Sequence, residues 1–194
     1  MRIIAGSARG RRLAGPGKGG RHHRIRPTSD RAREAVFNLL RAEIAGAFVL
    51  DLFAGTGAMA LEALSRGAEK AVLVDNNPGA LDLIKRNTEL CSFEKRAVCK
   101  RADLAGELDL LEQLRPEPGF SLVFMDPPYH MPLAGSMLEK ISRRNILAEE
   151  AVVVVEIRSG EELPHKAGDL ILYDQRSYGE AGFWFYSVKQ DEDR

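Results

Sequence analysis

The sequence predicts an α/β protein with a Rossmann-like, seven-stranded, mainly parallel sheet that carries helices on both faces. From residue 48 onward, short apolar runs alternate with glycine-containing turns and helical segments, which is the pattern of parallel strands joined by crossover helices. The last two apolar runs, residues 170–173 and 183–188, flank the turn-like Tyr178-Gly179-Glu180. They are typical of an antiparallel pair at the end of the sheet. The 194 residues are enough for one such domain and a short appendage.

Residues 1–26 are predicted to form a basic N-terminal arm ahead of a catalytic domain at 27–194. The arm begins with Arg2-Ile3-Ile4-Ala5, a candidate short strand or hairpin, and continues into a glycine-rich, basic stretch at residues 15–24. Glycine disfavours a regular helix and like charges repel, so we expect a mobile loop there. Ten of the 28 Lys and Arg residues, but one of the 28 Asp and Glu residues, lie between Met1 and Arg33. A solvated linker and a phosphate-binding arm both fit this charge run.

The elements of the catalytic domain follow from caps and periodicity. Thr28-Ser29-Asp30 after Pro27 predicts a helix start, and an apolar stripe from Ala32 to Ile44 gives that helix a buried face. The predicted strands lie at residues 48–52, 71–75, 96–100, 121–125, 151–157, 170–173 and 183–188. The other predicted helices lie at residues 58–65, at 78–90 with Asn76 or Asn77 as cap, at 104–114 and at 133–142.

Bulk composition excludes several classes of protein. The formal net charge is zero, so whole-chain charge predicts no partner. Cys91 and Cys99 lack metal-ligand spacing, which favours reduced, packed residues and no metal site. No apolar segment has the roughly 18 residues needed to span a bilayer, and we see no apolar signal core at the N-terminus. We therefore expect a cytoplasmic protein, and one compact catalytic domain favours a monomer.

A glycine loop follows the first strand of the domain. Gly55 and Gly57 permit positive φ and close approach of a ligand, and the helix that starts near Ala58 supplies free N–H groups. These residues also fit the relaxed dinucleotide fingerprint, so the glycines alone leave a nicotinamide-dependent oxidoreductase open. Asp51 shifts the balance, because an acid before the turn would repel a pyrophosphate but can hold a cationic amino-acid group.

The segment Asp51-Leu52-Phe53-Ala54-Gly55-Thr56-Gly57 resembles the motif of class I S-adenosylmethionine-dependent methyltransferases. In that family the glycine loop wraps the methionine moiety, the acid that ends the second strand holds the ribose, and an acid after the third strand reaches the adenine amine. For Asp103 a helix N-cap is the alternative interpretation. The resemblance implies cofactor contacts from Asp51, Phe53, Ala54, Gly55, Gly57, Asp75, Asn76, Asp103 and Leu104.

Asp126-Pro127-Pro128-Tyr129 follows the fourth strand and resembles the motif of methyltransferases that modify exocyclic or planar nitrogens. The lone pair of such an amine is delocalised into the ring, so two acceptors must bind its hydrogens and orient it. Pro127 stiffens the segment and has no N–H to compete for those acceptors. Tyr129 offers a face for an extruded base, a contact worth about 1–3 kcal/mol. The predicted catalytic residues are Asp126, Pro127 and Tyr129.

The N-terminal residues narrow the family further. Arg2-Ile3-Ile4-Ala5-Gly6, residues 26–34 and Phe37-Asn38 closely resemble the bacterial RsmD family of 16S ribosomal RNA (guanine-N2)-methyltransferases, and the likeness extends through both motifs to Tyr178-Gly179. The resemblance implies methylation of a guanine in small-subunit rRNA, free or in an assembling particle, with S-adenosylmethionine as cofactor. We expect rRNA phosphates to bind Arg9, Arg11, Arg12, Arg21, Arg24 and Arg26. An adenine-N6 or DNA substrate is the nearest rival, and a non-catalytic RNA-binding module would leave the carboxylates unexplained.

Overall fold

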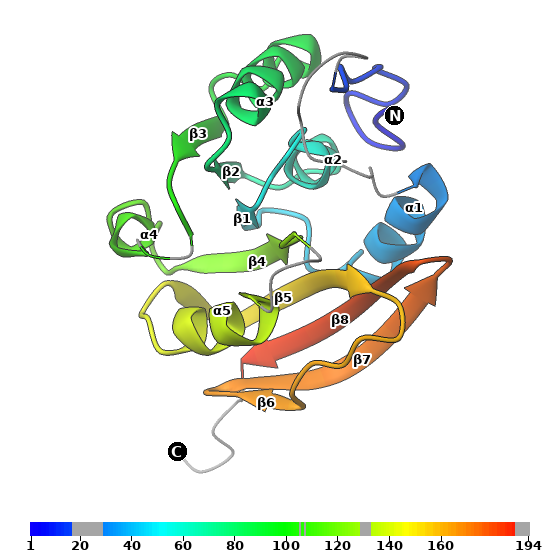
Figure 1. The fold of residues 1–194 in the computed structure, drawn as a ribbon. Coiled ribbons are helices and arrows are strands. Elements are labelled where there is room, and N and C mark those ends of the chain that lie inside the picture. The colour runs from blue at the N-terminus through cyan, green and yellow to red at the C-terminus, as the bar shows by residue number, and fades with distance from the viewer. Residues whose placement is uncertain (17–28, 105, 107, 129–132, 189–194) are drawn as a thin grey trace.

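One eight-stranded sheet forms the centre of the computed structural model, which describes residues 1–16, 29–104, 106, 108–128 and 133–188 (Figure 1). The strand order is β3-β2-β1-β4-β5-β8-β7-β6. β1 to β5 pair in parallel, whereas β8, β7 and β6 continue the sheet in antiparallel pairs. The strands are β1 Phe48–Leu52, β2 Lys70–Asp75, β3 Ala97–Arg101, β4 Phe120–Met125, β5 Leu147–Arg158, β6 Lys166–Ala167, β7 Leu170–Tyr178 and β8 Ala181–Val188.

Helices cover both faces of the sheet, and alternate strand residues face the two layers. One core contains side chains of the first three helices, together with Val49 and Phe124. The second core contains side chains of the last two, together with Leu50 and Met125. The helices are α1 Asp30–Leu39, α2 Ala58–Ser65, α3 Pro78–Cys91, α4 Asp109–Gln113 and α5 Leu133–Ser142. Because α2 follows β1 on one face and α5 follows β4 on the other, the strand order reverses between β1 and β4, where such sheets bind ligands.

The predicted α/β fold class is confirmed, with local differences. The sheet has eight strands because the two-residue β6 pairs with β7, a length too short for a periodicity signal. α1 ends at Leu39, although the apolar stripe continues to the buried Ile44. α4 begins at Asp109, so the helix predicted from residue 104 is wrong in its first half. Gly106 interrupts that stretch and disfavours a helix. Leu104 lies in a turn, and its side chain is buried.

The first 14 residues pack against α2 and α3 (Figure 1). Ile3, Ala8 and Leu13 are buried in the same core as α1 and α2. The expected short strand or hairpin is present only as a single antiparallel bridge between Arg2 and Arg12. Most of the predicted mobile loop lies outside the described residues.

Candidate active site

The two motifs lie side by side at the carboxyl ends of two neighbouring central strands. β1 and β4 are parallel neighbours, with Leu52 in register with Met125. The backbone N–H of Asp126 donates a hydrogen bond to the carbonyl of Leu52 at 3.3 Å. The glycine loop that follows β1 and the Asp126-Pro127-Pro128 segment that follows β4 therefore start from adjacent points.

The glycine loop adopts a backbone that most residues avoid. Phe53 has φ 60°, a left-handed value that costs free energy in a non-glycine residue and is typical of functional sites. Gly57, with φ 75°, occupies the N-cap of α2. A Cβ there would lie 2.9 Å from Leu73 Cδ2. The loop is also held by the Ala54 N–H, which donates to the Val74 carbonyl at 3.1 Å.

Asp51 is a buried carboxylate at the end of β1. It accepts a hydrogen bond from the Ala60 N–H in the first turn of α2 at 3.1 Å. Loss of hydration raises the pKa of Asp51 to about 8; the hydrogen bond from Ala60 lowers it, and the nearby Asp75 raises it further. Asp51 forms no salt bridge with any described residue. A bound cation would therefore favour the ionised form of Asp51.

Asp75 connects the glycine loop to the start of α3. Its carboxylate accepts hydrogen bonds from the Gly55 N–H at 2.9 Å and from the Asn77 N–H at 2.8 Å. Asn77, rather than Asn76, caps α3 by accepting from the Gly79 N–H. Asn76 is exposed beside it, at the same strand edge. A carboxylate has about four acceptor positions, so Asp75 keeps capacity for ribose hydroxyls.

Asp103 and Leu104 follow β3 at the same edge, since Asp75 and Arg101 are register partners. Asp103 is exposed, and Leu104 is buried in the second core. The alternative role of Asp103 as a helix N-cap is wrong, because Leu108 occupies that position of α4. Asp103 therefore lies at the strand edge without capping the next helix.

The Asp126 side chain is exposed, whereas Pro127 beside it is buried. Protein surrounds Asp126 on its other sides, and the resulting loss of hydration raises its pKa well above the usual value. The carboxylates of Glu156 and Asp51 raise that pKa further. Tyr129 lies outside the described residues.

Glu156 was missed at the level of sequence. It is buried near the end of β5, and the register pair Met125–Val155 puts it beside Asp126 on the neighbouring strand. A signal was available, because Glu156 ends an apolar run as Asp75 and Asp126 do. The signal was missed because β5 continues to Arg158, so Glu156 does not lie at the end of its strand.

Asn87 was also missed, and it joins the N-terminal segment to the glycine loop. This buried side chain of α3 accepts from the Ala14 N–H at 2.7 Å and donates to the Ala14 carbonyl at 3.1 Å. Its amide also donates to the Thr56 carbonyl at 2.9 Å. An amphipathic helix pattern cannot show which distant backbone a buried amide will bind.

Of the six arginines assigned to phosphate binding, Arg9, Arg11 and Arg12 are exposed on the N-terminal segment. Arg21, Arg24 and Arg26 lie outside the described residues. Within the described ranges, no group of three His, Cys, Asp or Glu side chains could hold a metal ion. No helix in those ranges is long and apolar enough to cross a membrane.

Comparisons with known proteins agree with this geometry. A family model described as "Conserved hypothetical protein 95" matches residues 1–187. "Putative rRNA methyltransferase YlbH" of Bacillus subtilis (strain 168) is 36% identical over 189 residues, which cover 97% of this chain and 100% of that protein. "Ribosomal RNA small subunit methyltransferase D" of Escherichia coli (strain K12) is 35% identical over 96% of this chain and 89% of its own. The solved structure "Putative methyltransferase yhhF from Escherichia coli" has a TM-score of 0.79 at 30% identity and covers 97% of this chain and 98% of its own.

Proposed function

The chain belongs to the RsmD family, whose model is described as "Conserved hypothetical protein 95", and we propose that it methylates small-subunit ribosomal RNA with S-adenosylmethionine. The target in this proposal is the exocyclic N2 amine of a guanine in 16S rRNA. The observation that carries the proposal is the contact between the two motifs, the Asp126 N–H on the Leu52 carbonyl at 3.3 Å. A methyl donor on the glycine loop and an amine on Asp126 would then share one strand edge.

The described residues fit the cofactor. S-adenosylmethionine, when bound, supplies an electrophilic methyl group on a sulfonium sulfur. Asp51 is buried and has no salt-bridge partner among the described residues. Its carboxylate is available to bind the amino-acid end of the cofactor. Asp75 would accept hydrogen bonds from the ribose hydroxyls, and Asp103 and Leu104 would lie beside the adenine. Phe53, Ala54, Gly55, Gly57 and Asn76 complete the proposed contacts.

Asp126 and the adjacent backbone orient the amine. The carboxylate accepts one amine hydrogen and a backbone carbonyl accepts the other, which directs the nitrogen lone pair at the methyl carbon. The bound cofactor would supply the methyl group: the N–C bond would form as the C–S bond breaks, and the electron pair of the C–S bond would stay on sulfur. The nitrogen then loses a proton to Asp126 or to water. Positioning of this kind can supply much of the acceleration. Pro127 keeps the segment rigid, and Tyr129 stacks on the extruded base.

Tritium transfer tests the proposal. Small subunits that lack this modification are incubated with the protein and methyl-tritiated S-adenosylmethionine, and the rRNA is digested to nucleosides. We expect label in N2-methylguanosine. Label in N6-methyladenosine, or in DNA offered as competitor, would instead support a different amine. Asp126→Ala should lose at least a thousandfold in transfer rate yet bind S-adenosylhomocysteine within twofold of wild type; retained transfer would refute the role of Asp126.

Two controls address the remaining alternatives. Fluorescence titration with NADH tests the nicotinamide reading of the glycine loop, and we expect no saturable binding. Comparison of free rRNA with assembled particles shows which is the substrate. We propose a monomeric, cytoplasmic enzyme, which sedimentation and cell fractionation would check.

A further inference from the structure

A groove separates the N-terminal segment, residues 1–14, from the first turn of α1. Its volume is about 420 Å³, within the range of roughly 300–1,000 Å³ that ligand sites occupy. Its lining residues include two acids and three arginines, namely Asp30, Glu34, Arg2, Arg9 and Arg31. None of the proposed cofactor or amine-binding residues lines it.

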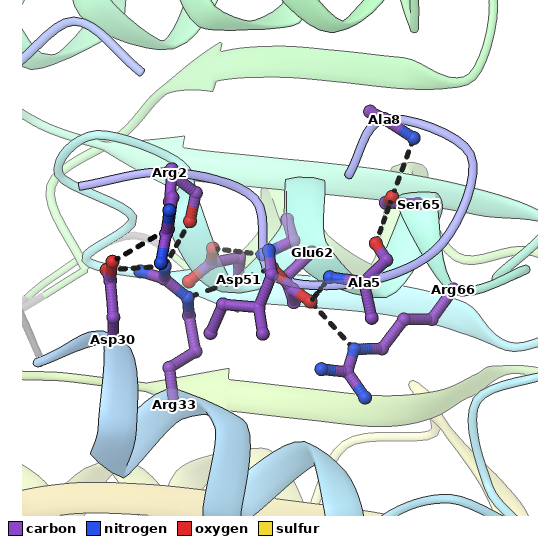
Figure 2. Close-up of polar contacts among 11 residues, drawn as sticks. Arg2, Ala5, Ala8, Asp30, Arg33, Asp51, Glu62, Ser65 and Arg66 are labelled. Carbon is purple, nitrogen blue, oxygen red and sulfur yellow. Dashed lines mark hydrogen bonds and ion pairs between the residues drawn. The ribbon is translucent and has the colours of Figure 1, made fainter. Parts of the chain in front are cut away.

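The wall of the groove formed by the N-terminal segment is fixed to α2 (Figure 2). The buried Glu62 carboxylate accepts hydrogen bonds from the Ile4 N–H at 2.7 Å and from the Ala5 N–H at 3.0 Å. Ser65 Oγ accepts from the Ala8 N–H at 3.0 Å and donates to the Ala5 carbonyl at 2.5 Å. The segment that carries Arg9 is therefore held in one position before any ligand binds.

Arg33 fixes the opposite wall, which α1 forms (Figure 2). This fully buried side chain donates through Nη2 to the Arg2 carbonyl and to Asp30 Oδ1, the latter at 3.0 Å. Arg2 Nε lies 3.7 Å from Asp30 Oδ2. Ser29 caps the helix by accepting from the Ala32 N–H. Both walls are thus preorganised, so little conformational entropy of the protein is lost when a ligand binds.

Three of the lining groups are free to bind a ligand. Arg9, Arg31 and Glu34 are exposed, and none forms a hydrogen bond or ion pair with the described part of the chain. A guanidinium binds phosphate oxygens in a bidentate manner. A carboxylate accepts hydrogen bonds from the exocyclic amine of a base. A nucleotide whose base carries an amine offers a phosphate to the two arginines and a hydrogen-bond donor to Glu34. A simple anion, in contrast, would be repelled by Glu34.

We infer that this groove is a second RNA site, which holds one unpaired nucleotide with an amine-bearing base beyond the methylated one. Arg9 and Arg31 bind its phosphate, and Glu34 accepts from the base amine. Uracil lacks an exocyclic amine, so the groove discriminates against it. The identification of the ligand as RNA rests on the proposed function. Arg11 and Arg12, which follow Arg9 on the N-terminal segment, are also exposed.

Binding of short labelled oligoribonucleotides tests the inference. Fluorescence anisotropy at low salt compares oligocytidine with oligouridine of equal length on the wild-type protein. Glu34 can accept a hydrogen bond from the cytosine amine, and uracil has no such donor, so we expect oligocytidine to bind at least fivefold tighter. Glu34→Ala should bring the two affinities within twofold. Arg31→Gln should weaken both by a similar factor, while Glu69→Ala and Arg41→Gln, exposed residues outside the groove, should preserve the preference.

The outcomes separate this inference from the proposed function. Equal binding of the two oligomers by wild type, or a preference that survives Glu34→Ala, overturns the groove assignment. Methyl transfer to unmodified small subunits is measured on the same preparations. Loss of the preference in Glu34→Ala with no transfer by wild type would refute the proposed function alone. Normal transfer by wild type without any base preference would refute the groove alone.

Discussion

At the residue scale, Asp51 makes cofactor affinity depend on pH. Its pKa of about 8 means that the free protein holds this carboxyl mostly protonated at pH 6. A cationic ligand group favours the ionised form, so binding releases a proton and tightens as pH rises. We expect the affinity for S-adenosylhomocysteine to increase between pH 6 and 7.5, by up to about tenfold per unit. Calorimetry across that range measures it.

The control for this prediction is Asp51→Asn. This variant keeps the shape of the side chain and cannot ionise, so its affinity should be lower and nearly constant over the same interval. A wild-type affinity that does not change between pH 6 and 7.5 would show that Asp51 does not face the cation. Above pH 8 the ligand amine itself loses its proton, so the comparison stops below that value.

Glu156 should set the pH range in which Asp126 works. Loss of hydration raises the pKa of Asp126, and the charge of Glu156 raises it further. The ionised form of Asp126 accepts the amine hydrogen more strongly and can take the proton that the nitrogen loses, so kcat should fall on the acid side. Glu156→Gln removes one negative charge, which lowers the pKa of Asp126 and moves this acid limb to lower pH.

The measurement is kcat for methyl transfer between pH 5 and 8. Glu161→Gln, an exposed residue beyond the end of β5, is the matched control and should leave the limb in place. Asp51 also raises the pKa of Asp126, so part of the wild-type shift should persist in Glu156→Gln. An acid limb at the same pH as in wild type would show that Glu156 does not affect the ionisation of Asp126.

At the scale of elements, α2 depends on Glu62 to hold the N-terminal segment. Glu62 is buried and accepts from two backbone N–H groups and from Arg66 Nε at 2.7 Å. Its Oε2 also lies 3.9 Å from Nε of the buried Arg33, two of whose nitrogens have no hydrogen-bond partner. Glu62→Ala would leave these groups unpaired. We expect a loss of about 3–5 kcal/mol in the free energy of unfolding.

Urea denaturation measures this loss, with Glu69→Ala as control. Glu69 is exposed, and its side chain forms no hydrogen bond or ion pair within the described residues, so its removal should cost less than about 0.5 kcal/mol. Glu62→Gln keeps the acceptor oxygen and should fall between the two. A Glu62→Ala variant as stable as Glu69→Ala would mean that the N-terminal segment contributes little to the fold.

The elements that the sequence predicted correctly are those with local signals. β1, α2 and α5 have the predicted bounds, because apolar runs, the glycine turn and helical periodicity act over a few residues. The hydrogen bonds of Glu62 to Ile4 and Ala5 join residues 58 and 57 positions apart. No local pattern encodes such a contact, so the N-terminal segment was predicted as an arm although its first residues pack in the core.

The candidate site divides in the same way. Asp51, Asp75 and Asp126 could be predicted because each lies at the end of an apolar strand, and parallel strands end at one edge. The position of Glu156 required the β4–β5 register, and that of Asn87 required the packing of α3. The groove at Arg9, Arg31 and Glu34 required two segments to come together. Residues that depend on tertiary contacts were therefore the ones missed.

At the scale of the whole molecule, cationic and anionic residues are separated along the chain. The formal net charge is zero, but ten basic residues and one acid lie between Met1 and Arg33. The N-terminal segment lies beside α2 and α3, at the opposite end of the sheet from β6 and β7 (Figure 1). It carries the exposed Arg9, Arg11 and Arg12. A polyanion would therefore approach the face that carries the N-terminal segment.

The salt dependence of RNA binding tests this orientation. Each phosphate contact contributes about 0.7 to the slope of log K against log salt on single strands and about 0.9 on a duplex. Replacing Arg9, Arg11 and Arg12 together by Ala should lower the slope by about 2–3 and leave cofactor affinity unchanged. The matched triple variant Arg143→Ala, Lys166→Ala and Arg176→Ala removes the same charge from exposed residues beyond α4. Because global charge affects both triple variants equally, only a specific phosphate contact makes the first slope fall more than the second, and equal slopes would place the RNA elsewhere.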